Sequence, residues 1–346
     1  MSTRILNAQG ILSSEVPTGN LLWVDQVNGV DGLAVRGRMT IPFRTLTAAK
    51  GAAKSGDKIM VLPGNYDERN LLKNGVNWHF LNGAVVQYSG TADGGIFDTS
   101  STGANQAVNS AITGFGIFAV GQPSLNAKGH VIQSAATSDH LFIQARSMSS
   151  YDTAIKIASS SSTVEVSVLE GLSCSLDAIS VVGASTSSII RAHSIISSGA
   201  ALYVGAGSID AFAHRITAGA DGAIVIAGGT GAVTVRAFEM LSSTDHAVKY
   251  TASSTFPKLT VIGSRIVTAG VSKRAVDFSS NNSSVSKKVR LASCVLIATD
   301  TVSIKSAYNG TVVPIHCECV ANKAQDATVN FGSPATGDFR VSTDID

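Results

Sequence analysis

The sequence is short of charge and of long apolar runs, and each shortage excludes a class of protein. Only 14% of its 346 residues are charged and the net charge is +2, so we expect no partnership with nucleic acid or with a charged membrane. No apolar run reaches the roughly 18 residues that a membrane-spanning helix needs. The first twenty residues contain Arg4 and Glu15 and lack an apolar core followed by a cleavage site. We therefore expect no secretory signal peptide.

Cysteine is scarce as well, with four residues at positions 174, 294, 317 and 319. Their uneven spacing argues against a disulfide framework and suits folding in a reducing cytoplasm. The segment 316–319, His-Cys-Glu-Cys, holds ligand types that zinc prefers. However, Cys317 and Cys319 share one face of a strand, and Cys294 lies in the preceding repeat. We expect a small stack of reduced cysteines there and no metal site.

Aromatic residues make up only 6% of the chain, which leaves no evident platform of rings for stacking against sugars. Trp23 and Trp78 both lie in the N-terminal region, where we expect them to pack inside. The histidines show no metal-ligand spacing combined with nearby acids, so we expect ordinary structural or surface roles for all seven. They are His79, His130, His140, His193, His214, His246 and His316.

The chain does contain a short motif that recurs through its second half: an alanine followed by three residues, of which the first and third are apolar. The copies are Ala154–Ile157, Ala178–Val181, Ala201–Val204, Ala223–Ile226, Ala247–Tyr250 and Ala275–Phe278. Successive copies begin 24, 23, 22, 24 and 28 residues apart. A period in the twenties indicates a solenoid, in which each repeat buries its apolar face against its neighbours.

Each repeat contains two further β-branched runs, such as Val164–Val166 and Leu172–Cys174, separated by breakers rich in glycine and serine. Three short strands and three turns per repeat, with no room for a helix, predict an all-β fold: a parallel β-helix with about 22–28 residues per coil. Leucine-rich repeats have a similar length, but their leucine and asparagine spacing is absent. Earlier coils extend back to about Ala84, and nine or ten coils at about 4.8 Å each give a shaft about 45 Å long.

The N-terminal third carries a different pattern. Pro42 precedes an apolar stripe formed by Leu46, Ala49 and Ala53, and Gly56 follows it, which predicts a helix over about residues 43–55. The apolar run 58–62 after it, Lys-Ile-Met-Val-Leu, ends in a Pro-Gly turn and predicts a strand.

Residues 23–66 follow the pattern V-D, N-G-x-D-G, P-F-x-T-L, G-D-x-I-x-V-L-P-G-x-Y. This pattern is similar to the opening of right-handed β-helix proteins of the pectin-lyase-like superfamily, which is frequent in bacteriophage tailspikes, tail fibres and other virion proteins and in secreted polysaccharide-processing enzymes. The resemblance implies a right-handed, single-stranded parallel β-helix whose N-terminal end is plugged by the helix at 43–55. We therefore expect an attachment arm at residues 1–20, a cap at 21–66 and the β-helix at 67–346.

Four aspartates just before the first strand of successive coils are the best candidates for a site: Asp152, Asp177, Asp221 and Asp245. Stacked carboxylates could raise a pKa, hold a cation or cut a glycosidic bond. Aspartate is also a good turn residue. Gly199 takes the equivalent place in one coil, and Lys273 falls opposite Asp245 in another. We favour the structural role and expect no catalytic residue, cofactor or metal.

We accordingly expect a non-enzymatic structural protein of a bacteriophage virion: a fibre, spike or capsid decoration that is made in the host cytoplasm. The arm at residues 1–20 would bind another virion protein, and coil faces rich in alanine, serine and glycine would associate as a homotrimer. A host-surface glycan is a further possible partner. The alternative is a depolymerase, a glycoside hydrolase or polysaccharide lyase that acts on bacterial surface polysaccharide through the aspartates.

Overall fold

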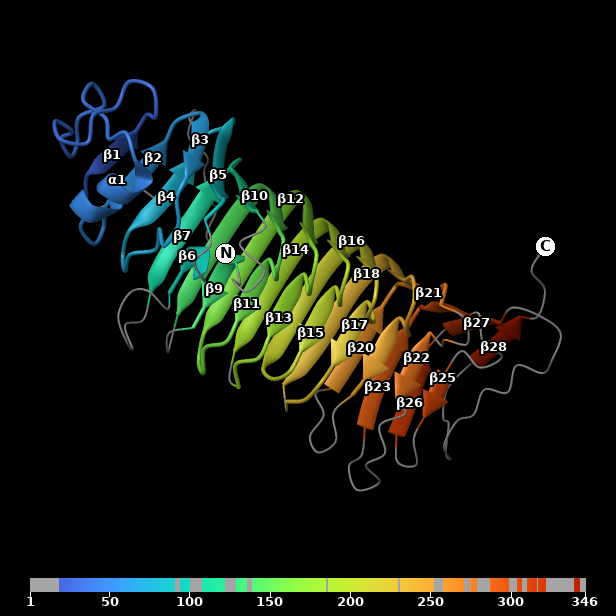
Figure 1. Cartoon of the computed structure of the whole chain (residues 1–346). Helices are drawn as coiled ribbons and strands as arrows, with labels where there is room; N and C mark the ends of the chain where they lie inside the picture. Colours follow the sequence, from blue (N-terminus) through green and yellow to red (C-terminus); the bar gives the residue numbers. More distant parts are fainter. Residues whose placement is uncertain are drawn as a thin grey trace.

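The fold is seen in a computed structural model that describes most of the chain. The described residues are 19–90, 94–99, 108–121, 129–135, 139–184, 186–229, 231–251, 258–270, 273, 275–278, 287–298, 304–306, 310–315, 317–321 and 339–342. Within them, one short helix and 28 strands form a rod along which the chain advances in sequence order (Figure 1). None of these elements is a helix with the length and apolarity that crossing a bilayer requires.

The strands form two parallel sheets. The larger sheet has 19 strands: β1 (Leu21–Val24), β2 (Lys58–Val61), β3 (Gly64–Asp67), β4 (Asn77–Phe80), β5 (Ala84–Tyr88), β7 (Asn109–Gly114), β8 (Ile117–Val120), β10 (His140–Ser150), β12 (Thr163–Cys174), β14 (Ser187–Ser197), β16 (Ser208–Ala218), β18 (Ala232–Ser242), β20 (Lys258–Ile262), β21 (Arg265–Thr268), β23 (Lys287–Ala292), β24 (Val295–Ala298), β26 (Gly310–Ile315), β27 (Cys317–Ala321) and β28 (Phe339–Ser342).

The smaller sheet has nine strands: β6 (Gly94–Asp98), β9 (Gly129–Ser134), β11 (Ile155–Ile157), β13 (Ile179–Val181), β15 (Leu202–Val204), β17 (Ile224–Ile226), β19 (Val248–Tyr250), β22 (Val276–Phe278) and β25 (Ile304–Ser306). In the larger sheet the long strand β18 pairs with β20 through its first half and with β21 through its second. Each long strand therefore supplies two sides of a coil, and the smaller sheet supplies the third.

Strand pairing confirms the parallel β-helix and its period. In the smaller sheet Ile155 pairs with Ile179, Ile179 with Leu202, and Leu202 with Ile224. Ile224 then pairs with Val248, which pairs with Val276. The steps between these partners equal the steps between the alanines of the repeated motif, so each repeat is one coil.

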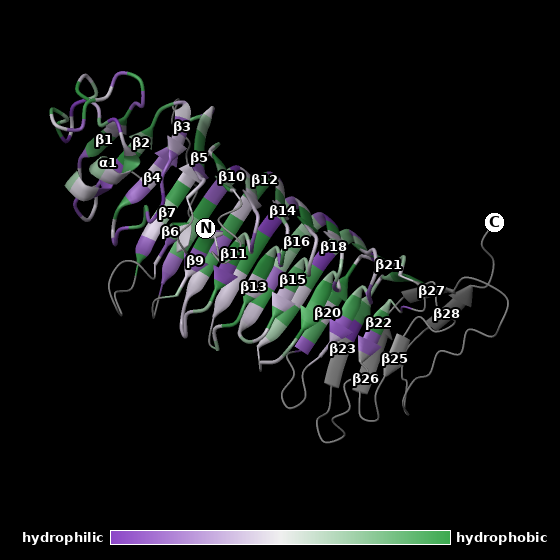
Figure 2. Cartoon of the chain, in the orientation of Figure 1, coloured by the Kyte–Doolittle hydropathy of each residue, from purple (hydrophilic) through white to green (hydrophobic). Residues whose placement is uncertain are grey.

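The interior is a continuous column of apolar side chains. Apolar and polar residues alternate along the strands, as Figure 2 shows, because successive side chains of a strand point to opposite faces. The alanines that open the repeated motif are all fully buried: Ala154, Ala178, Ala201, Ala223, Ala247 and Ala275. A small side chain at this corner lets the turn close over the core.

The N-terminal coils are filled by aromatic rings. Phe118 makes edge-to-face contacts with Phe80 at 5.1 Å and with Phe97 at 4.9 Å between ring centroids. Trp78 stacks against Phe80 at 6.0 Å, and all four rings are fully buried. Such pairs add roughly 0.5–1.5 kcal/mol each beyond the burial of their area. Trp78 is inside, as the sequence predicted, whereas Trp23 is only half-buried.

The capping helix is shorter than the predicted span 43–55. Helix α1 covers Leu46–Ala52 and lies beside β1 and β2 at the N-terminal end of the rod (Figure 1). Phe43 cannot be helical because it bridges to β1: its N–H donates to Trp23 O, and its carbonyl accepts from Asp25 N–H, both at 2.8 Å. Thr45 then caps the helix by accepting from Ala48 N–H.

The predicted apolar stripe of the helix is confirmed, since Leu46, Ala49 and Ala53 are buried. Parallel stacking begins with β1 and β2, inside the expected cap at 21–66, and β3 runs across the boundary to the expected β-helix. The cap strands and the coils therefore belong to one sheet. Residues 1–18 of the expected arm lie outside the described residues.

Phe118→Ala should lower the free energy of unfolding by about 3 to 5 kcal/mol, because it removes a ring that touches two others and leaves a cavity. Equilibrium unfolding in urea measures this loss. Phe115→Ala is the matched control: its side chain is 50% exposed, so the change should stay within about 0.5 kcal/mol. Equal effects from the two substitutions would contradict the described core.

Candidate functional site

The four predicted aspartates lie at one corner of the rod, ahead of the strands of the smaller sheet. Asp152, Asp221 and Asp245 each stand three residues before a strand, the place that Gly199 and Lys273 take in other coils. Asp177 does not hold this place, because it stands two residues before β13. Its carboxylate accepts a hydrogen bond from Ala200 N–H of the next coil at 3.0 Å, which is a turn-holding role.

Asp245 is the centre of an ion-pair network. Its carboxylate lies 2.5 Å from Lys249 Nζ and 3.0 Å from Lys273 Nζ, so the predicted pairing with Lys273 is confirmed. Burial raises the pKa of Asp245, but hydrogen bonds from Lys249, the backbone of His246 and Lys273 outweigh it and hold the pKa below its ordinary value. A carboxyl group in this setting is a poor general acid.

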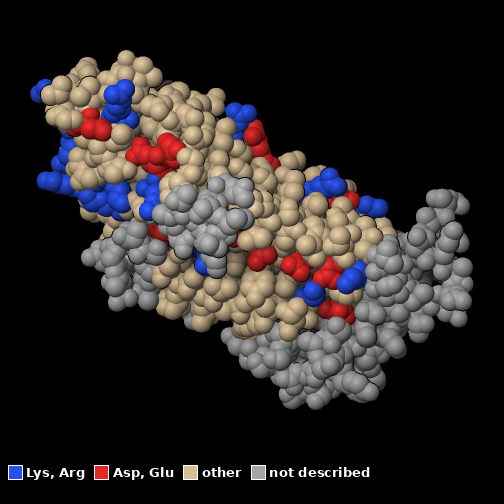
Figure 3. All heavy atoms as spheres, in the orientation of Figure 1, with Lys and Arg blue, Asp and Glu red and all other residues tan. Residues whose placement is uncertain are grey.

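Asp221 and Asp245 both lie close to one lysine. Lys249 Nζ lies between them, 4.0 Å from Asp221 Oδ1 and 2.5 Å from Asp245 Oδ2. His246 Nε2 lies 3.8 Å from Asp245 and 3.3 Å from Asp277. Carboxylates and lysines therefore lie side by side at this end of the corner, and Figure 3 shows charges of both signs gathered as small patches on a mostly uncharged rod.

Asp152 and Asp177, unlike Asp221 and Asp245, have no lysine beside their carboxylates in the described part of the chain. Burial, together with the charges of Asp221 and Asp152, raises the pKa of Asp177 above its ordinary value, although the Ala200 N–H opposes the rise. Asp152 is buried, and its Oδ2 has no hydrogen-bond partner. His130 Nδ1 lies 3.9 Å from that oxygen and hydrogen-bonds to Thr153 O at 2.9 Å, while burial lowers the pKa of His130.

The structure describes two of the four cysteines with their side chains and no cluster of metal-binding residues. In the described part of the chain, no three His, Cys, Asp or Glu side chains gather closely enough to hold a metal ion. Cys174 and Cys294 are free thiols, and burial raises the pKa of Cys174 to about 11. Leu296 is the register partner of Cys319. The side chains of Cys317 and Cys319 lie outside the described part of the structure, so the cysteine stack stays a prediction. His316 lies outside the described residues.

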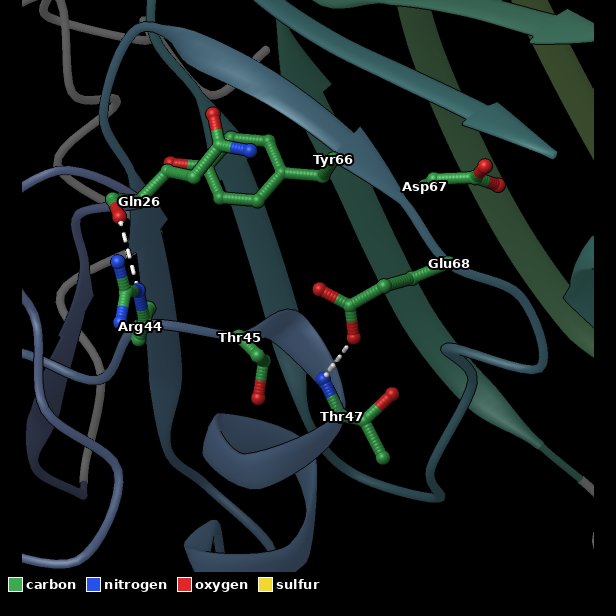
Figure 4. A pocket seen from close by; sticks show the side chains of 7 residues that line it. All are labelled: Gln26, Arg44, Thr45, Thr47, Tyr66, Asp67 and Glu68. Carbon is green, nitrogen blue, oxygen red and sulfur yellow. Dashed lines mark hydrogen bonds between the residues drawn. The ribbon is translucent and has the colours of Figure 1, made fainter.

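A hollow of about 400 Å³ lies beside the capping helix (Figure 4). It is lined by Gln26, Arg44, Thr45, Thr47, Tyr66, Asp67 and Glu68. Glu68 accepts hydrogen bonds from the N–H groups of Leu46 and Thr47, at 2.7 and 2.6 Å, and so completes the start of α1. Asp67 accepts from Ser89 of the next coil. Because these carboxylates serve the cap, we assign the hollow a structural role.

A second hollow, of about 450 Å³, runs over β12, β14, β16 and β18 where these long strands bend. We call it the bend groove. It is lined by Ser167, Val168, Leu169, Arg191, Ala192, His193, Phe212, Ala213, His214 and Arg236. Its floor is made of small residues, and its two walls are columns of larger side chains that repeat from coil to coil.

One wall is a sandwich of two guanidinium groups around a ring. Arg191, Phe212 and Arg236 are register partners in β14, β16 and β18. The Cζ atoms of Arg191 and Arg236 lie 5.6 and 4.6 Å from the Phe212 ring centroid. Carboxylates outside the groove hold both arginines: Glu165 pairs with Arg191, and Asp210 pairs with Arg236 at 2.9 Å.

The other wall is a ladder of stacked rings. His193 and His214 lie 5.3 Å apart with planes at 8°, and His214 and Phe238 lie 5.1 Å apart with planes at 3°. Since each ring comes from a successive coil, the stack runs along the rod and presents its edges to solvent. Leu169, in the coil before His193, lies 63% exposed on the same wall, and Phe238 is 67% exposed.

Sequence reasoning missed the bend groove. It gave His193 and His214 ordinary roles and found no aromatic platform. The signal was nevertheless present: His214 follows His193 by 21 residues and Phe238 follows His214 by 24, as Phe212 follows Arg191 and Arg236 follows Phe212. The predicted period rests on apolar residues alone, although the outward columns of polar and aromatic residues repeat with it.

Comparison with protein-family models, with curated proteins and with solved structures finds no match to this chain. The class of the protein therefore follows from its architecture: it is a parallel β-helix.

Asp245→Asn should lower the free energy of unfolding at pH 7 by about 1.5 to 3 kcal/mol, because it leaves two lysines without their carboxylate. A depressed folded pKa means that Asp245 stabilises the fold above its unfolded pKa, about 4. That stabilisation is lost as pH falls through the folded pKa. The difference between mutant and parent should therefore shrink in acid, as measured by urea unfolding from pH 7 to pH 3.

Asp177→Asn should act in the opposite direction. A raised folded pKa means that the contribution of Asp177 to stability is most favourable below about pH 4 and declines as pH rises through the folded pKa. The substitution should therefore stabilise the protein at pH 7 by about 0.5 to 1 kcal/mol and have no effect well below pH 4. Destabilisation at pH 7 comparable to that of Asp245→Asn would contradict the assignment.

Proposed function

We propose that this protein is a non-enzymatic structural component of a bacteriophage virion: a β-helical rod that serves as a fibre, spike or capsid decoration. The observation that carries the proposal is the parallel pairing of successive coils, which runs through the described strands of the larger sheet from β1 to β28 with local register shifts in β10 and β12. Every coil is tied to the next by parallel backbone hydrogen bonds, which makes a stiff post. The pattern at residues 23–66, similar to the opening of virion β-helix proteins, supports the same class.

Surface ion pairs between coils suit a load-bearing role. Glu239 bridges Arg215 and Arg265 of the coils on either side, at 3.1 and 2.8 Å, and Arg146 pairs with Glu170 at 2.7 Å. Exposed pairs of this kind add little stability individually. They do favour one register of the stack over slipped alternatives, because a slip would move each carboxylate away from its arginine partner.

The start of the rod offers a firm anchor for the proposed attachment arm at residues 1–20. Asn20 N–H donates to Asp57 at 2.8 Å, and Gly19 N–H donates to Gly56 O at 3.1 Å. Asp57 is buried and also holds Arg36 through hydrogen bonds as short as 2.6 Å and Lys54 N–H at 2.7 Å. A pull on the arm would therefore be passed through Asp57 into the first coil.

The location in a particle can be tested by immunogold electron microscopy. Antibodies raised against the purified protein should label intact virions from cultures that produce it, at a fixed place on each particle. The matched control is serum depleted on the same protein. Label confined to cell debris or to the culture fluid, with bare particles, would overturn the virion assignment.

We further propose that three rods associate in parallel through coil faces rich in small residues. Light scattering during size-exclusion chromatography should then give three times the chain mass of 35.5 kDa. A single species at the chain mass at micromolar concentration would remove the trimer from the proposal and leave the rod unaffected.

A depolymerase is the second candidate, and the raised pKa of Asp177 beside Asp152 is the observation that favours it. A general acid needs a raised pKa, and a carboxylate partner is required for hydrolysis. Incubation with capsular or secreted bacterial polysaccharides, followed by assays for reducing ends and unsaturated sugars, should give no product. Products that disappear with Asp177→Asn but persist with Asp245→Asn would establish the enzyme instead.

A further inference from the structure

We propose that the side chains of Lys50, in helix α1, and Asn70, which follows β3, are joined by an amide bond that forms within the folded chain and releases ammonia. The bond would tie the helix at the N-terminal end of the rod to the first coil. This inference goes beyond the proposed function. It concerns the purified chain alone, so its failure would leave the virion assignment untouched.

The folded chain brings the amine of Lys50 to Asn70. Lys50 Nζ donates a hydrogen bond to the main-chain oxygen of Asn70, the residue whose side-chain amide would react. Lys73 reaches back and donates to three carbonyl oxygens at the C-terminal end of α1, at 2.6 to 3.3 Å. Asn70 N–H donates to Gly95 O of β6, in the next coil, at 3.0 Å. The end of the helix and Asn70 are therefore held against each other before any bond forms.

The side chain of Asn70 lies in a polar cluster around Gly94. The φ of Gly94 is 126°, a value that suits glycine. A Cβ atom at this position would lie 3.1 Å from Asp98 Oδ2, 3.5 Å from Arg69 Nη1 and 3.6 Å from Asn70 Oδ1. Asp98 is buried in β6. The missing side chain of Gly94 thus lets a buried carboxylate, a guanidinium group and the amide converge on one place.

The surroundings of Lys50 favour its neutral, nucleophilic form. Burial and then the charge of Lys73 lower the pKa of Lys50 below its ordinary value, although the carboxylate of Asp98 opposes them. A lowered pKa leaves more of the amine unprotonated at neutral pH. Only the unprotonated amine has the lone pair that attack on a carbonyl carbon requires.

The bond can form with the groups that are present. Lys50 Nζ bonds to Asn70 Cγ, and the Asp98 carboxylate accepts a proton from the attacking nitrogen. The Arg69 guanidinium stabilises the negative charge that develops on the amide oxygen. Asp98 then passes the proton to the amide nitrogen, the old C–N bond breaks, and ammonia leaves. One amide replaces another, so the reaction needs no oxidant, reductant or further reactant.

Fixed geometry is what would make this reaction fast enough. An amide reacts slowly with a free amine in solution, but groups held together in a fold react as though at very high concentration. The product closes the chain between positions 50 and 70, which restricts the unfolded state. The helix could then not be pulled away from the first coil without breaking a covalent bond.

The experiment is mass spectrometry of the purified full-length protein. Its intact mass should be lower than the sequence mass by about 17 Da, which is one ammonia. Trypsin cannot cleave after an acylated lysine, so digestion should release a branched peptide in which residues 45–54 are joined to residues 70–73.

Three variants test the assigned roles. Lys50→Arg keeps the positive charge but has no amine to acylate, and Asn70→Gly suits the φ of 55° at this position but has no amide. Both should have the full sequence mass. Asp98→Asn should slow formation of the branched peptide by about a hundredfold or more, because it removes the base.

The matched control is Lys54→Arg. This exposed lysine lies just beyond α1, so the variant makes the same chemical change as Lys50→Arg close to the same helix. It should still lose ammonia and still give a branched peptide with residues 70–73.

The parent protein decides the question by itself, so a variant that circular dichroism shows to be unfolded leaves the test intact. The full sequence mass with no branched peptide would overturn the proposal. So would a mass loss that survives Lys50→Arg. Mapping of the loss to an Asn-Gly pair such as Asn74–Gly75, which can release ammonia by closing a ring on its own backbone, would overturn it as well.

Discussion

The structure depends on one constraint: successive coils pair in parallel, so that residues one coil apart in the chain, 19 to 37 positions among the described pairs, become neighbours about 4.8 Å apart. Each position of a coil therefore belongs to a column. Apolar columns fill the interior, an alanine column lets one corner close, and the polar columns form the outer surface. A property repeated once per coil becomes a continuous stripe on the rod.

The same constraint makes like charges costly, because a column of aspartates would place carboxylates side by side. The chain resolves this at the corner in two ways. At Asp245 a lysine from its own coil and Lys273 from the next coil surround the carboxylate. At Asp177 the side chain is displaced from the column and bonds to the backbone of the following coil, yet its pKa stays raised. Columns can also be favourable, as in the stacked rings and the guanidinium sandwich of the bend groove.

Much of the fold could be predicted from sequence because burial enforces the period: inward positions of the coils are mostly apolar, and the corner position is an alanine in six coils. The first residue of the helix could not be predicted, because Phe43 is held extended by hydrogen bonds to Trp23 and Asp25, which are distant in sequence. The bend groove could not be predicted from the sequence for a related reason. Outward positions tolerate many residues, and the placement of Arg191 is decided by Glu165 of the preceding coil.

The register of the stack can be measured directly by disulfide trapping in a chain whose native cysteines are replaced by alanine. Thr234 and Thr260 are register partners at about 4.8 Å, within reach of a disulfide, whereas Thr234 and Ile262 lie two residues out of step and beyond about 7 Å. Mild oxidation should cross-link Thr234→Cys with Thr260→Cys quickly and Thr234→Cys with Ile262→Cys hardly at all. Equal rates for the two pairs, or no cross-link in either, would contradict the stacked β-helix.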